Sequence, residues 1–525
     1  MSPHSPFSSV LCTNYAPTQG ERQQIKSILL EPVQELERLD QQILRLQAQR
    51  AELKSFIDNH QALLSPSRKM PEELWREVFS WLRLLPQEVD LIPCRKTTTP
   101  LSLTAVCRQW YAVATSTPQL WRSISVGIPK SNSWFRIEMR PLGNGSQQGV
   151  TSWLKQSGTL PLDLSLYGEG DSVTKIAQTF VHFSRRWKSL NLVDVGKEGV
   201  ELLAGADAPL LEAIFLISKR RLDSSQAAGL FQCLAKHPRL HTLSLHIQFD
   251  ITIMMNTTTQ WSHLTTLYLS IFFNDPPAAH IIVTLANLCP LLSTCIMRCI
   301  STPGNRVIPE APIHAPILWP HIQKLDLSFW IGTLARRNIA PDLSSVSRAL
   351  DAITTPALTD LAFIFGAHQA ASPSTTLLFV PPFHHFLKRS GCNGFLVCLT
   401  VELLWGVDSV LGLLATVPSL KTLRIMYASD MEASDEGRFM HSLTSREICP
   451  ALESIEVLNF SASQADVILE LLEARRRGLA HNTFCLSVKS LRPPGTPMKD
   501  SERLDHDLAL QPTLDRLKQQ GVVVV

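Results

Sequence analysis

The stretch Leu240-His-Thr-Leu-Ser-Leu245 and the following stretch Leu264-Thr-Thr-Leu-Tyr-Leu269 share one spacing of apolar residues. In both, the first, fourth and sixth residues are leucine, and the residues between them are polar or aromatic. In an extended chain the fourth and sixth side chains point to the same side, so each stretch predicts a short strand with one buried face. Two such strands in succession indicate a repeated structural unit.

The same spacing recurs along most of the chain, with other apolar residues in place of some leucines. Eight further copies are Trp187–Leu192, Leu211–Leu216, Leu292–Met297, Ile322–Leu327, Leu358–Phe363, Leu396–Val401, Leu420–Ile425 and Leu452–Val457. Successive copies begin roughly 24 to 38 residues apart, a period typical of repeat proteins. Helix-compatible segments lie between copies, at Ala227–Lys236, Ala279–Asn287, Val346–Ile353, Val407–Ala415 and Gln464–Arg477. Several copies follow a proline by two or three residues, which would end the preceding helix before the strand starts.

This pattern resembles the leucine-rich repeat. The resemblance implies an α/β fold for residues 159–525, an irregular solenoid of short parallel strands and convex helices in which stacked neighbours build the core. The asparagine that follows the strand in regular repeats is absent from nearly every copy, so the expected arc is irregular. An ordinary α/β domain with leucine-rich parallel strands is the alternative. The C-terminal stretch Leu514–Val525 predicts a last helix, a stop at Gly521 and a final strand that caps the solenoid.

Two shorter helical patterns precede the repeats. They are Met70-Pro-Glu-Glu-Leu-Trp-Arg-Glu-Val-Phe-Ser-Trp-Leu82 and Leu101-Ser-Leu-Thr-Ala-Val-Cys-Arg-Gln-Trp110. Apolar residues recur at helical spacing in both, and Pro71 suits the first turn of a helix. Two helices this short cannot bury so much aromatic surface on each other, so a further partner is needed from the chain or from another protein. A three-helix packing unit with no binding role is the alternative.

The order and spacing of these residues are similar to those of an F-box. The matching residues are Pro71, Glu73, Leu74, Val78, Phe79, Leu82, Val106, Cys107, Arg108, Trp110, Leu120 and Trp121. Met70 stands where leucine is usual, and the stretch 83–100 is longer than the usual loop. The resemblance implies an F-box-like helical domain at residues 65–126 that docks on a Skp-type adaptor and through it on cullin and RING subunits. The residues that it places at the adaptor interface are Pro71, Leu74, Val78, Phe79, Leu82, Val106 and Trp110.

The N-terminal region divides into two parts. Residues 1–20 are rich in serine and proline and are expected to be disordered. Residues 21–64 predict an amphipathic helix or short coiled coil, because apolar residues follow a heptad spacing that Arg50 and His60 interrupt. The flanking positions Asp40, Gln42, Gln47 and Gln49 lack complementary charge. A homodimer through this helix is therefore a hypothesis, and the alternative is a helix laid against the F-box or the body of the protein.

Composition narrows the classes of function. The chain has 525 residues and a net charge of +3, which gives no electrostatic case for nucleic-acid binding. We expect no membrane contact, because the sequence has neither a signal peptide nor an apolar run long enough to span a bilayer. Eleven cysteines without a paired framework fit reduced thiols, and hence a cytoplasmic or nuclear location. The basic run Arg475-Arg-Arg477 is expected to be the solvated end of a helix.

The sequence predicts no catalytic or metal site and no cofactor. Cys233, Cys289, Cys295 and Cys299 form no Cys-x-x-Cys pair, and Cys295 falls on a predicted buried strand position. The stretch Gly143-Asn-Gly-Ser-Gln-Gln-Gly149 lacks the residues of a P-loop, so residues 127–158 are interpreted as a linker. His384 and His385 lie in a stretch rich in proline and aromatic residues, which favours a loop.

Together these patterns predict a non-catalytic substrate-recognition subunit of an SCF (Skp–cullin–F-box) ubiquitin ligase, whose repeat arc binds an unknown protein substrate. Recognition is expected from strand residues between the buried leucines, chiefly Asn191, His246, Tyr268, Asp326 and Arg424, with Thr242, Ser244, Lys324 and Glu456 as further candidates. Three alternatives remain open. They are a scaffold that binds the adaptor for a purpose other than ubiquitin transfer, a repeat-type interaction protein whose N-terminal helices cap the solenoid, and an enzyme of unfamiliar kind.

Overall fold

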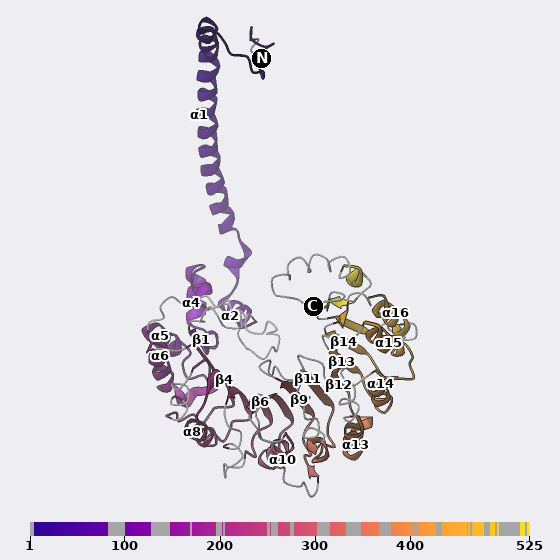
Figure 1. Cartoon of the computed structure of the whole chain (residues 1–525). Helices are drawn as coiled ribbons and strands as arrows, with labels where there is room; N and C mark the ends of the chain where they lie inside the picture. The colour runs from indigo at the N-terminus through magenta and orange to yellow at the C-terminus, as the bar shows by residue number, and fades with distance from the viewer. Residues whose placement is uncertain are drawn as a thin grey trace. The chain divides into compact units, whose positions relative to one another are not determined.

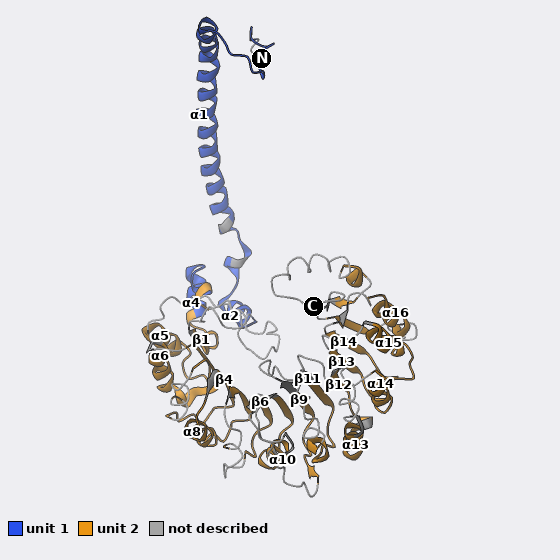
Figure 2. Cartoon of the chain, viewed as in Figure 1, with its two compact units in different colours: residues 1–85, 103–114 blue, residues 86–102, 115–525 orange. Residues whose placement is uncertain are grey.

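The computed structural model divides the chain into two compact units, coloured separately in Figure 2. Unit 1 contains residues 1–85 and 103–114, and unit 2 contains residues 86–102 and 115–525. The structure describes residues 5–81, 100–127, 147–168, 171–195, 202, 205–248, 253, 261–273, 278–301, 316–331, 348–366, 380–402, 407–426, 433–458, 460–461, 465–476, 484–488, 491–492, 515–519 and 522–524.

Unit 1 is helical. Its elements are α1 Gln19–Leu63, η1 Pro66–Lys69, α2 Glu72–Trp81 and α4 Arg108–Thr115, and the short α3 Pro100–Thr104 crosses the boundary between the units. The first turn of α1 is stabilised by the carboxylate of Glu21, which accepts a hydrogen bond from the main-chain N–H of Thr18 at 2.7 Å. The α2 and α4 helices pack through aromatic rings, with the centroid of Trp110 lying 4.7 Å from that of Trp75 and 5.1 Å from that of Phe79. This aromatic cluster forms the core of the helix pair.

Unit 2 is built on one parallel sheet of 14 strands. The strands follow the order β1-β2-β3-β4-β5-β6-β7-β9-β11-β12-β13-β14-β16-β18, so nearly every strand pairs with the next one along the chain. Their bounds are β1 Ser123–Gly127, β2 Leu162–Tyr167, β3 Trp187–Val193, β4 Ala213–Arg221, β5 Thr242–Gln248, β6 Thr266–Phe273, β7 Thr294–Ser301, β9 Lys324–Ile331, β11 Asp360–Gly366, β12 Cys398–Glu402, β13 Thr422–Met426, β14 Ser454–Leu458, β16 Cys485–Val488 and β18 Val523–Val524. Two small parallel pairs complete the strands, β8 Ile317–Leu318 with β10 Ile353–Thr354 and β15 Phe460–Ser461 with β17 Leu491–Arg492.

A helix follows most strands of unit 2 and returns the chain to the start of the next. These helices are α5 Gln147–Gln156, α6 Asp171–Val181, α8 Ser224–Leu234, α10 Ala278–Leu288, α13 Val380–Ser390, α14 Val407–Ala415, α15 Ala433–Ser442 and α16 Ala465–Arg476, with short 3₁₀ turns η2 Pro118–Trp121, η3 Ser184–Arg186 and η4 Cys392–Gly394. Within unit 2 the strands line the inner side of a curved sheet and the helices cover the outer side (Figure 1). Unit 2 is thus a solenoid-like α/β arrangement, and the predicted parallel sheet is confirmed.

The register of the sheet aligns the repeated leucines into continuous rows. The fourth position of each repeat forms one buried row, Ile124, Leu164, Leu190, Ile214, Leu243, Leu267, Cys295, Leu325, Leu361, Leu399, Leu423, Ile455 and Leu486. The sixth position forms a parallel row on the same side of the sheet. Each fully buried leucine contributes roughly 1.5–3 kcal/mol, and a repeat obtains that burial only from its neighbours. Cys295 occupies a leucine position in this row, as its sequence position predicts.

All ten predicted copies of the repeat contain a strand, and the sheet begins earlier than the predicted repeat domain. β1 begins within the stretch Trp121-Arg-Ser-Ile-Ser-Val126, which has the same one–four–six spacing, and it pairs with β2. The indole rings of Trp121 and Trp153 pack edge to face at 4.9 Å. The closing Leu-Trp of the F-box-like pattern therefore belongs to the first strand unit, and α5 lies inside the segment interpreted as a linker. The side chains that α5 buries are Val150, Trp153 and Leu154.

Two further expectations differ from the structure. His384 and His385 lie in helix α13 and not in a loop, because Pro381 and Pro382 occupy its first turn, where prolines need no main-chain partner. Arg475 is at the end of α16 as expected but is buried and not solvated. Its guanidinium donates hydrogen bonds to the carbonyl oxygens of Leu443, Ser445, Ile448 and Cys449 at 2.7 to 3.1 Å. The guanidinium thus provides hydrogen-bond donors for the main-chain carbonyl groups of the turn between α15 and β14.

The C-terminal strand β18 pairs with β16 at the edge of the sheet, and the side chain of Leu517 before it is buried. The predicted final strand is therefore present in the described part of this region. Among the helices that the structure describes, none combines the length and the apolar character needed to cross a membrane. The glycine-rich stretch before α5, at residues 143–146, lies outside the described residues, as does the long stretch at 82–99.

Replacing Arg475 with methionine should destabilise unit 2, because the carbonyl groups of the buried residues Leu443 and Cys449 would lose their donor. We expect a loss of about 3 kcal/mol in the free energy of unfolding, measured by urea denaturation. Arg438→Met is the matched control, since Arg438 is exposed and makes an ion pair with the exposed Asp408. Its loss should cost less than about 0.5 kcal/mol. Equal effects of the two substitutions would contradict a structural role for Arg475.

Candidate functional site

The inner face of the sheet carries the residues that alternate with the leucine core. One row on this face contains the fifth residue of each repeat, which lies between the buried fourth and sixth residues. In strand order the row is Ser125, Ser165, Asn191, Phe215, Ser244, Tyr268, Ile296, Asp326, Ala362, Thr400, Arg424, Glu456, Ser487 and Val523. Because neighbouring strands lie about 4.8 Å apart, the eight steps from Asn191 to Arg424 span roughly 38 Å along the sheet.

The structure places all nine predicted recognition residues on this inner face. Asn191, Ser244, Tyr268, Asp326, Arg424 and Glu456 share the fifth-position row, Thr242 and Lys324 lie one row before it, and His246 lies one row after it. They do not form one compact cluster, since they follow the strands across the sheet. The face therefore suits recognition of an extended segment or a broad protein surface better than the binding of a small molecule.

The N-terminal half of the face carries most of its aromatic and large apolar side chains. Tyr167, Phe215, Ile217, Tyr268 and Ile296 are buried or half-buried there. The Nδ2 group of Asn191 donates a hydrogen bond to the hydroxyl oxygen of Tyr167 at 3.3 Å. Burial raises the pKa of Tyr268, so its hydroxyl is protonated and available as a donor. This half therefore offers aromatic and apolar side chains interspersed with small polar ones, such as Ser165 and Ser244.

His246 is a second titratable group on this half of the face. Its Nδ1 lies 2.7 Å from the hydroxyl oxygen of Ser270 on the next strand. Burial lowers the pKa of His246 to about 4, and the nearby positive charge of Arg298 acts in the same direction. The imidazole is therefore neutral at physiological pH, where it acts as a hydrogen-bonding group and carries no charge.

The C-terminal half of the face is charged. Nε of Arg424 donates to Oε2 of Glu456 at 3.1 Å, which joins strands β13 and β14. Burial tends to lower the pKa of Arg424, but the thiol of Cys398 and the negative charge of Glu456 outweigh it, and the pKa lies above its usual value. The guanidinium remains charged and fixed in place, as recognition of an acidic group would require.

Asp326 lies on the same half, between Lys324 in its own strand and Ala362 on the next. The hydroxyl of Ser328 donates to its Oδ1 at 2.9 Å. Burial raises the pKa of Asp326, although this hydrogen bond and the positive charges of Arg298 and Lys324 oppose the shift. The carboxyl group is thus held partly desolvated at a point where a basic partner would gain from pairing with it.

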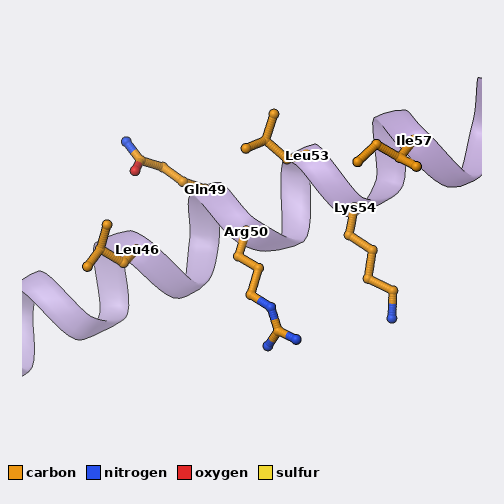
Figure 3. A pocket seen from close by; sticks show the side chains of 6 residues that line it. All are labelled: Leu46, Gln49, Arg50, Leu53, Lys54 and Ile57. Atoms are coloured by element: carbon orange, nitrogen blue, oxygen red, sulfur yellow. The ribbon is translucent and has the colours of Figure 1, made fainter.

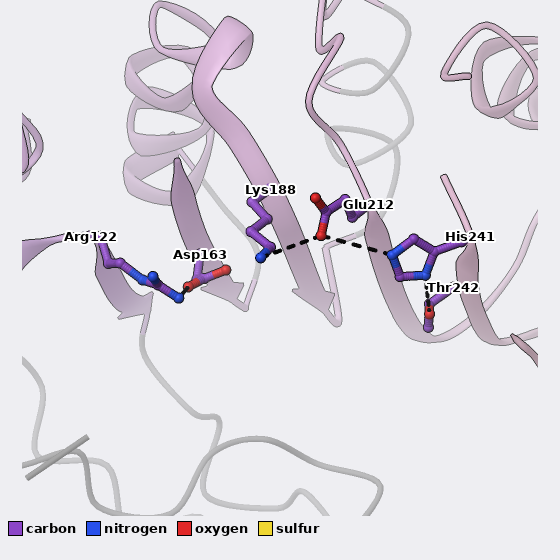
Figure 4. A network of polar contacts seen from close by, with 6 residues as sticks. All are labelled: Arg122, Asp163, Lys188, Glu212, His241 and Thr242. Atoms are coloured by element: carbon purple, nitrogen blue, oxygen red, sulfur yellow. Dashed lines mark hydrogen bonds and ion pairs between the residues drawn. The ribbon is translucent and has the colours of Figure 1, made fainter. Parts of the chain in front are cut away.

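Near the start of strands β1 to β5, residues at the second and third positions of the repeats form a polar border. Figure 4 shows three ion pairs here, Arg122 with Asp163 at 3.1 Å, Lys188 with Glu212 at 3.4 Å, and His241 with Glu212 at 3.8 Å. Nδ1 of His241 also lies 3.0 Å from the hydroxyl oxygen of Thr242. These groups are partly exposed, so each pair contributes at most about 1 kcal/mol.

A second candidate surface lies on α2 in unit 1, which has two apolar faces. Trp75 and Phe79 point into the aromatic cluster and are buried. Leu74, Val78 and Trp81, spaced by four and three residues, lie on the other side and are 54%, 44% and 60% exposed. A helix that shows a second apolar stripe at helical spacing offers a ready contact surface.

The predicted adaptor residues fall into two groups on this helix pair. Leu74, Val78, Val106 and Pro71 are exposed, whereas Phe79 is buried and Trp110 packs between Trp75 and Phe79. Leu82 lies outside the described residues. Sequence reasoning missed Trp81 and the exposed Tyr111, although the spacing of Trp81 from Leu74 and Val78 is a sufficient signal for the first.

The described residues contain no group of three or more histidine, cysteine or acidic side chains arranged to hold a metal ion. Cys289 and Cys295 are buried, and burial raises the pKa of Cys289 to about 12 and that of Cys295 further. Such thiols are poor nucleophiles and poor metal ligands. Sequence reasoning also missed the apolar members of the recognition face, Phe215 and Ile296, because it selected polar residues although the fifth position of the repeat identifies both.

Comparison with known proteins adds little to this description. No protein-family model matches the chain, and no curated protein matches it. A solved structure of a Bacteroides fragilis protein from the Northeast Structural Genomics Consortium matches at 14% sequence identity and a TM-score of 0.27. The match covers 60% of this chain and 66% of the other, slightly under two thirds of its length. A TM-score of this size establishes no common fold, so the description of unit 2 rests on its own strand pairing.

The buried neutral state of His246 predicts a pH-dependent stability. In the unfolded chain the imidazole takes up a proton near pH 6.5, and in the folded chain only near pH 4. Between these values the unfolded state binds more protons, so stability is complete above pH 6.5 and falls as the pH falls. His246→Gln should reduce the loss between pH 7 and pH 5 by roughly 1–2 kcal/mol, measured by urea denaturation at both pH values. The same substitution at the exposed His182 is the control, and an equal effect there would contradict the assignment.

Proposed function

We propose that the chain is the substrate-recognition subunit of an SCF-type ubiquitin ligase. In this proposal the F-box-like helices of unit 1 dock on a Skp-type adaptor, and through it on cullin and RING subunits. Unit 2 acts as a leucine-rich-repeat-like solenoid that binds a protein substrate on its inner face. The observation that carries the proposal is the exposed apolar stripe of α2, which lies in the stretch that resembles an F-box.

In this proposal one face of α2 packs inside unit 1 and the other face contacts the adaptor. Trp75 and Phe79 hold α2 against α4, so they position the contact surface from within. Leu74 and Val78 stand on the outer side and supply apolar area that a helix of the adaptor would cover. Binding of this kind depends on a few buried anchors surrounded by weaker contacts. Of the seven predicted adaptor residues, Phe79 and Trp110 then act through packing and the exposed ones by direct contact.

The inner face of unit 2 suits the second half of the proposal. A substrate that crosses its aromatic and charged halves would be held in one orientation, because only one direction matches apolar groups with Phe215 and Tyr268 and charged groups with Arg424 and Asp326. The chain would then act without catalytic groups of its own. Its contribution is to hold a substrate lysine near ubiquitin that is activated elsewhere in the assembly, which raises the effective concentration of the reactants.

The first prediction concerns adaptor binding. Leu74→Ala/Val78→Ala should weaken binding to a Skp-type adaptor by at least about tenfold, because two apolar anchors of the interface are lost. The measurement is co-expression of the full chain with a tagged adaptor, followed by recovery on the tag and titration calorimetry of the purified proteins. Both side chains are exposed, so the variant should keep the thermal unfolding temperature of the wild type. Phe395→Ala, which removes another exposed apolar side chain, is the matched control.

The outcomes separate the open alternatives. A folded wild type that fails to bind the adaptor contradicts the ligase proposal and leaves a stand-alone interaction protein. Adaptor binding without assembly of the cullin and RING subunits, or without ubiquitin transfer in a reconstituted reaction, favours a scaffold with another purpose. Equal losses in the control and in the double variant would show that the stripe on α2 is not the contact surface.

A second prediction concerns the inner face. Tyr268→Ala/Asp326→Ala/Arg424→Ala should remove the proteins that the adaptor-bound chain retains from a cell extract, measured by quantitative mass spectrometry. The triple variant should still bind the adaptor, because unit 1 is unchanged. The control is Lys388→Ala/Arg438→Ala, which changes exposed charges on the helices α13 and α15. Retention of the same proteins by the triple variant would contradict recognition on the inner face.

A further inference from the structure

Helix α1 carries a continuous apolar stripe along most of its length. Ile25, Leu29, Leu36, Leu39, Ile43, Leu46, Leu53 and Ile57 alternate at spacings of three and four residues, with Pro32, Arg50 and His60 completing the series. This is the heptad pattern of a coiled coil, in which these residues occupy the a and d positions. From Leu36 to Ile57 the apolar members are 42% to 63% exposed. An exposed seam of this length is typical of a helix that pairs with another helix.

A shallow depression lies on the seam of α1. Figure 3 shows a depression lined by Leu46, Gln49, Arg50, Leu53, Lys54 and Ile57. These six residues make two overlapping sets with spacings of three, four and seven residues, one beginning at Leu46 and the other at Arg50. In a coiled coil each such set of four forms the hole that receives one side chain of the facing helix. The depression therefore consists of two adjacent holes on the seam.

We propose that α1 pairs with α1 of a second copy of this chain in an antiparallel two-helix coiled coil. In the proposed register Ile43 of one copy packs against Leu53 of the other, Leu39 against Ile57, and Leu46 against Arg50. Leu46 and Ile43 of the second copy then enter the two holes of the depression. This proposal goes beyond the ligase function and does not depend on it.

Charge decides between the two directions of pairing. In the antiparallel register Asp40 lies beside Lys54 of the second copy, and the two-fold axis repeats the attraction. In a parallel pair Asp40 would instead face Glu35 of the second copy, because these positions meet across a parallel seam. The sequence positions Asp40, Gln42, Gln47 and Gln49 alone show no complementary charge. Lys54, which occupies the same heptad position as Asp40 two heptads later, supplies the complementary positive charge.

The irregular residues of the seam also fit this register. Arg50 meets Leu46 of the second copy near the two-fold axis, where its aliphatic stem can cover the leucine while its guanidinium reaches water. A single polar residue on a coiled-coil seam lowers stability but fixes the register. Pro32, which removes one main-chain hydrogen bond from α1, falls at the end of the shared stretch, opposite the last leucines. The regular part of each helix thus faces the regular part of the other.

The first experiment measures the mass of the full-length chain by sedimentation velocity over concentrations from about 1 to 100 μM, a range that spans common dimer affinities. The wild type should sediment as a dimer, at twice the chain mass of 58.6 kDa. Ile43→Asp/Leu53→Asp should weaken the dimer at least about 100-fold, since it places charge in two layers of the seam. Leu44→Asp/Ala51→Asp introduces the same charge on exposed positions beside the seam and should leave the dimer intact.

Charge reversal tests the direction. Asp40→Lys or Lys54→Asp alone should weaken the antiparallel dimer several-fold, and the double reversal should restore it. In a parallel dimer Asp40→Lys would instead strengthen association, because it would remove the repulsion from Glu35. A wild type that remains monomeric over the whole range, or a dimer that the seam variant leaves intact, overturns the proposal. Strengthening by Asp40→Lys overturns the antiparallel register.

Discussion

The structure of unit 2 depends on the parallel pairing of successive strands, in a register that keeps the fourth, fifth and sixth positions of the repeats aligned. Because the partners in the ladder keep the same position in every repeat, the first, fourth and sixth residues stack into uninterrupted apolar rows. A single strand of five to nine residues has no face on which to bury three such side chains. Neighbouring repeats supply that face, so the cohesion of unit 2 is spread along the sheet and is not concentrated in one centre.

The same register creates the inner face. Each residue between two buried leucines is forced to the opposite side of the sheet, where the helices do not cover it. Core packing thus fixes the position of the row from Asn191 to Glu456 but does not fix which side chains occupy it. In the turns that connect the strands, main-chain carbonyl groups have no partner in the sheet. The buried side chain of Arg475 donates hydrogen bonds to such carbonyl groups.

The sequence predicted ten strands that carry the full apolar spacing, because that spacing directly reflects which side chains are buried. Strand β1 has the spacing too, but its residues were assigned to the F-box-like domain. The sequence did not reveal β2 or β16, whose first apolar position is absent, or the helix α13, whose opening prolines resemble a loop. The positions of the inner face were predicted correctly, but only polar residues at those positions were selected as candidates. Phe215 and Ile296 were therefore omitted. In unit 1 the aromatic residues were recognised as important, yet only the structure separates Phe79 and Trp110, which pack inward, from Leu74 and Val78, which are exposed. Periodicity shows that a helix has an apolar side, but not which of two apolar sides is already covered.

The inner face also has an evolutionary consequence. Substitutions at the exposed and half-buried positions of the fifth-position row leave the buried rows unchanged, so packing constrains these positions less than it constrains the leucines. Read strand by strand, the row spells Ser-Ser-Asn-Phe-Ser-Tyr-Ile-Asp-Ala-Thr-Arg-Glu-Ser-Val. Related chains would keep the buried leucines while the residues of the fifth-position row change. Two chains with similar residues in this row would then share a binding preference even where their overall sequence identity is low.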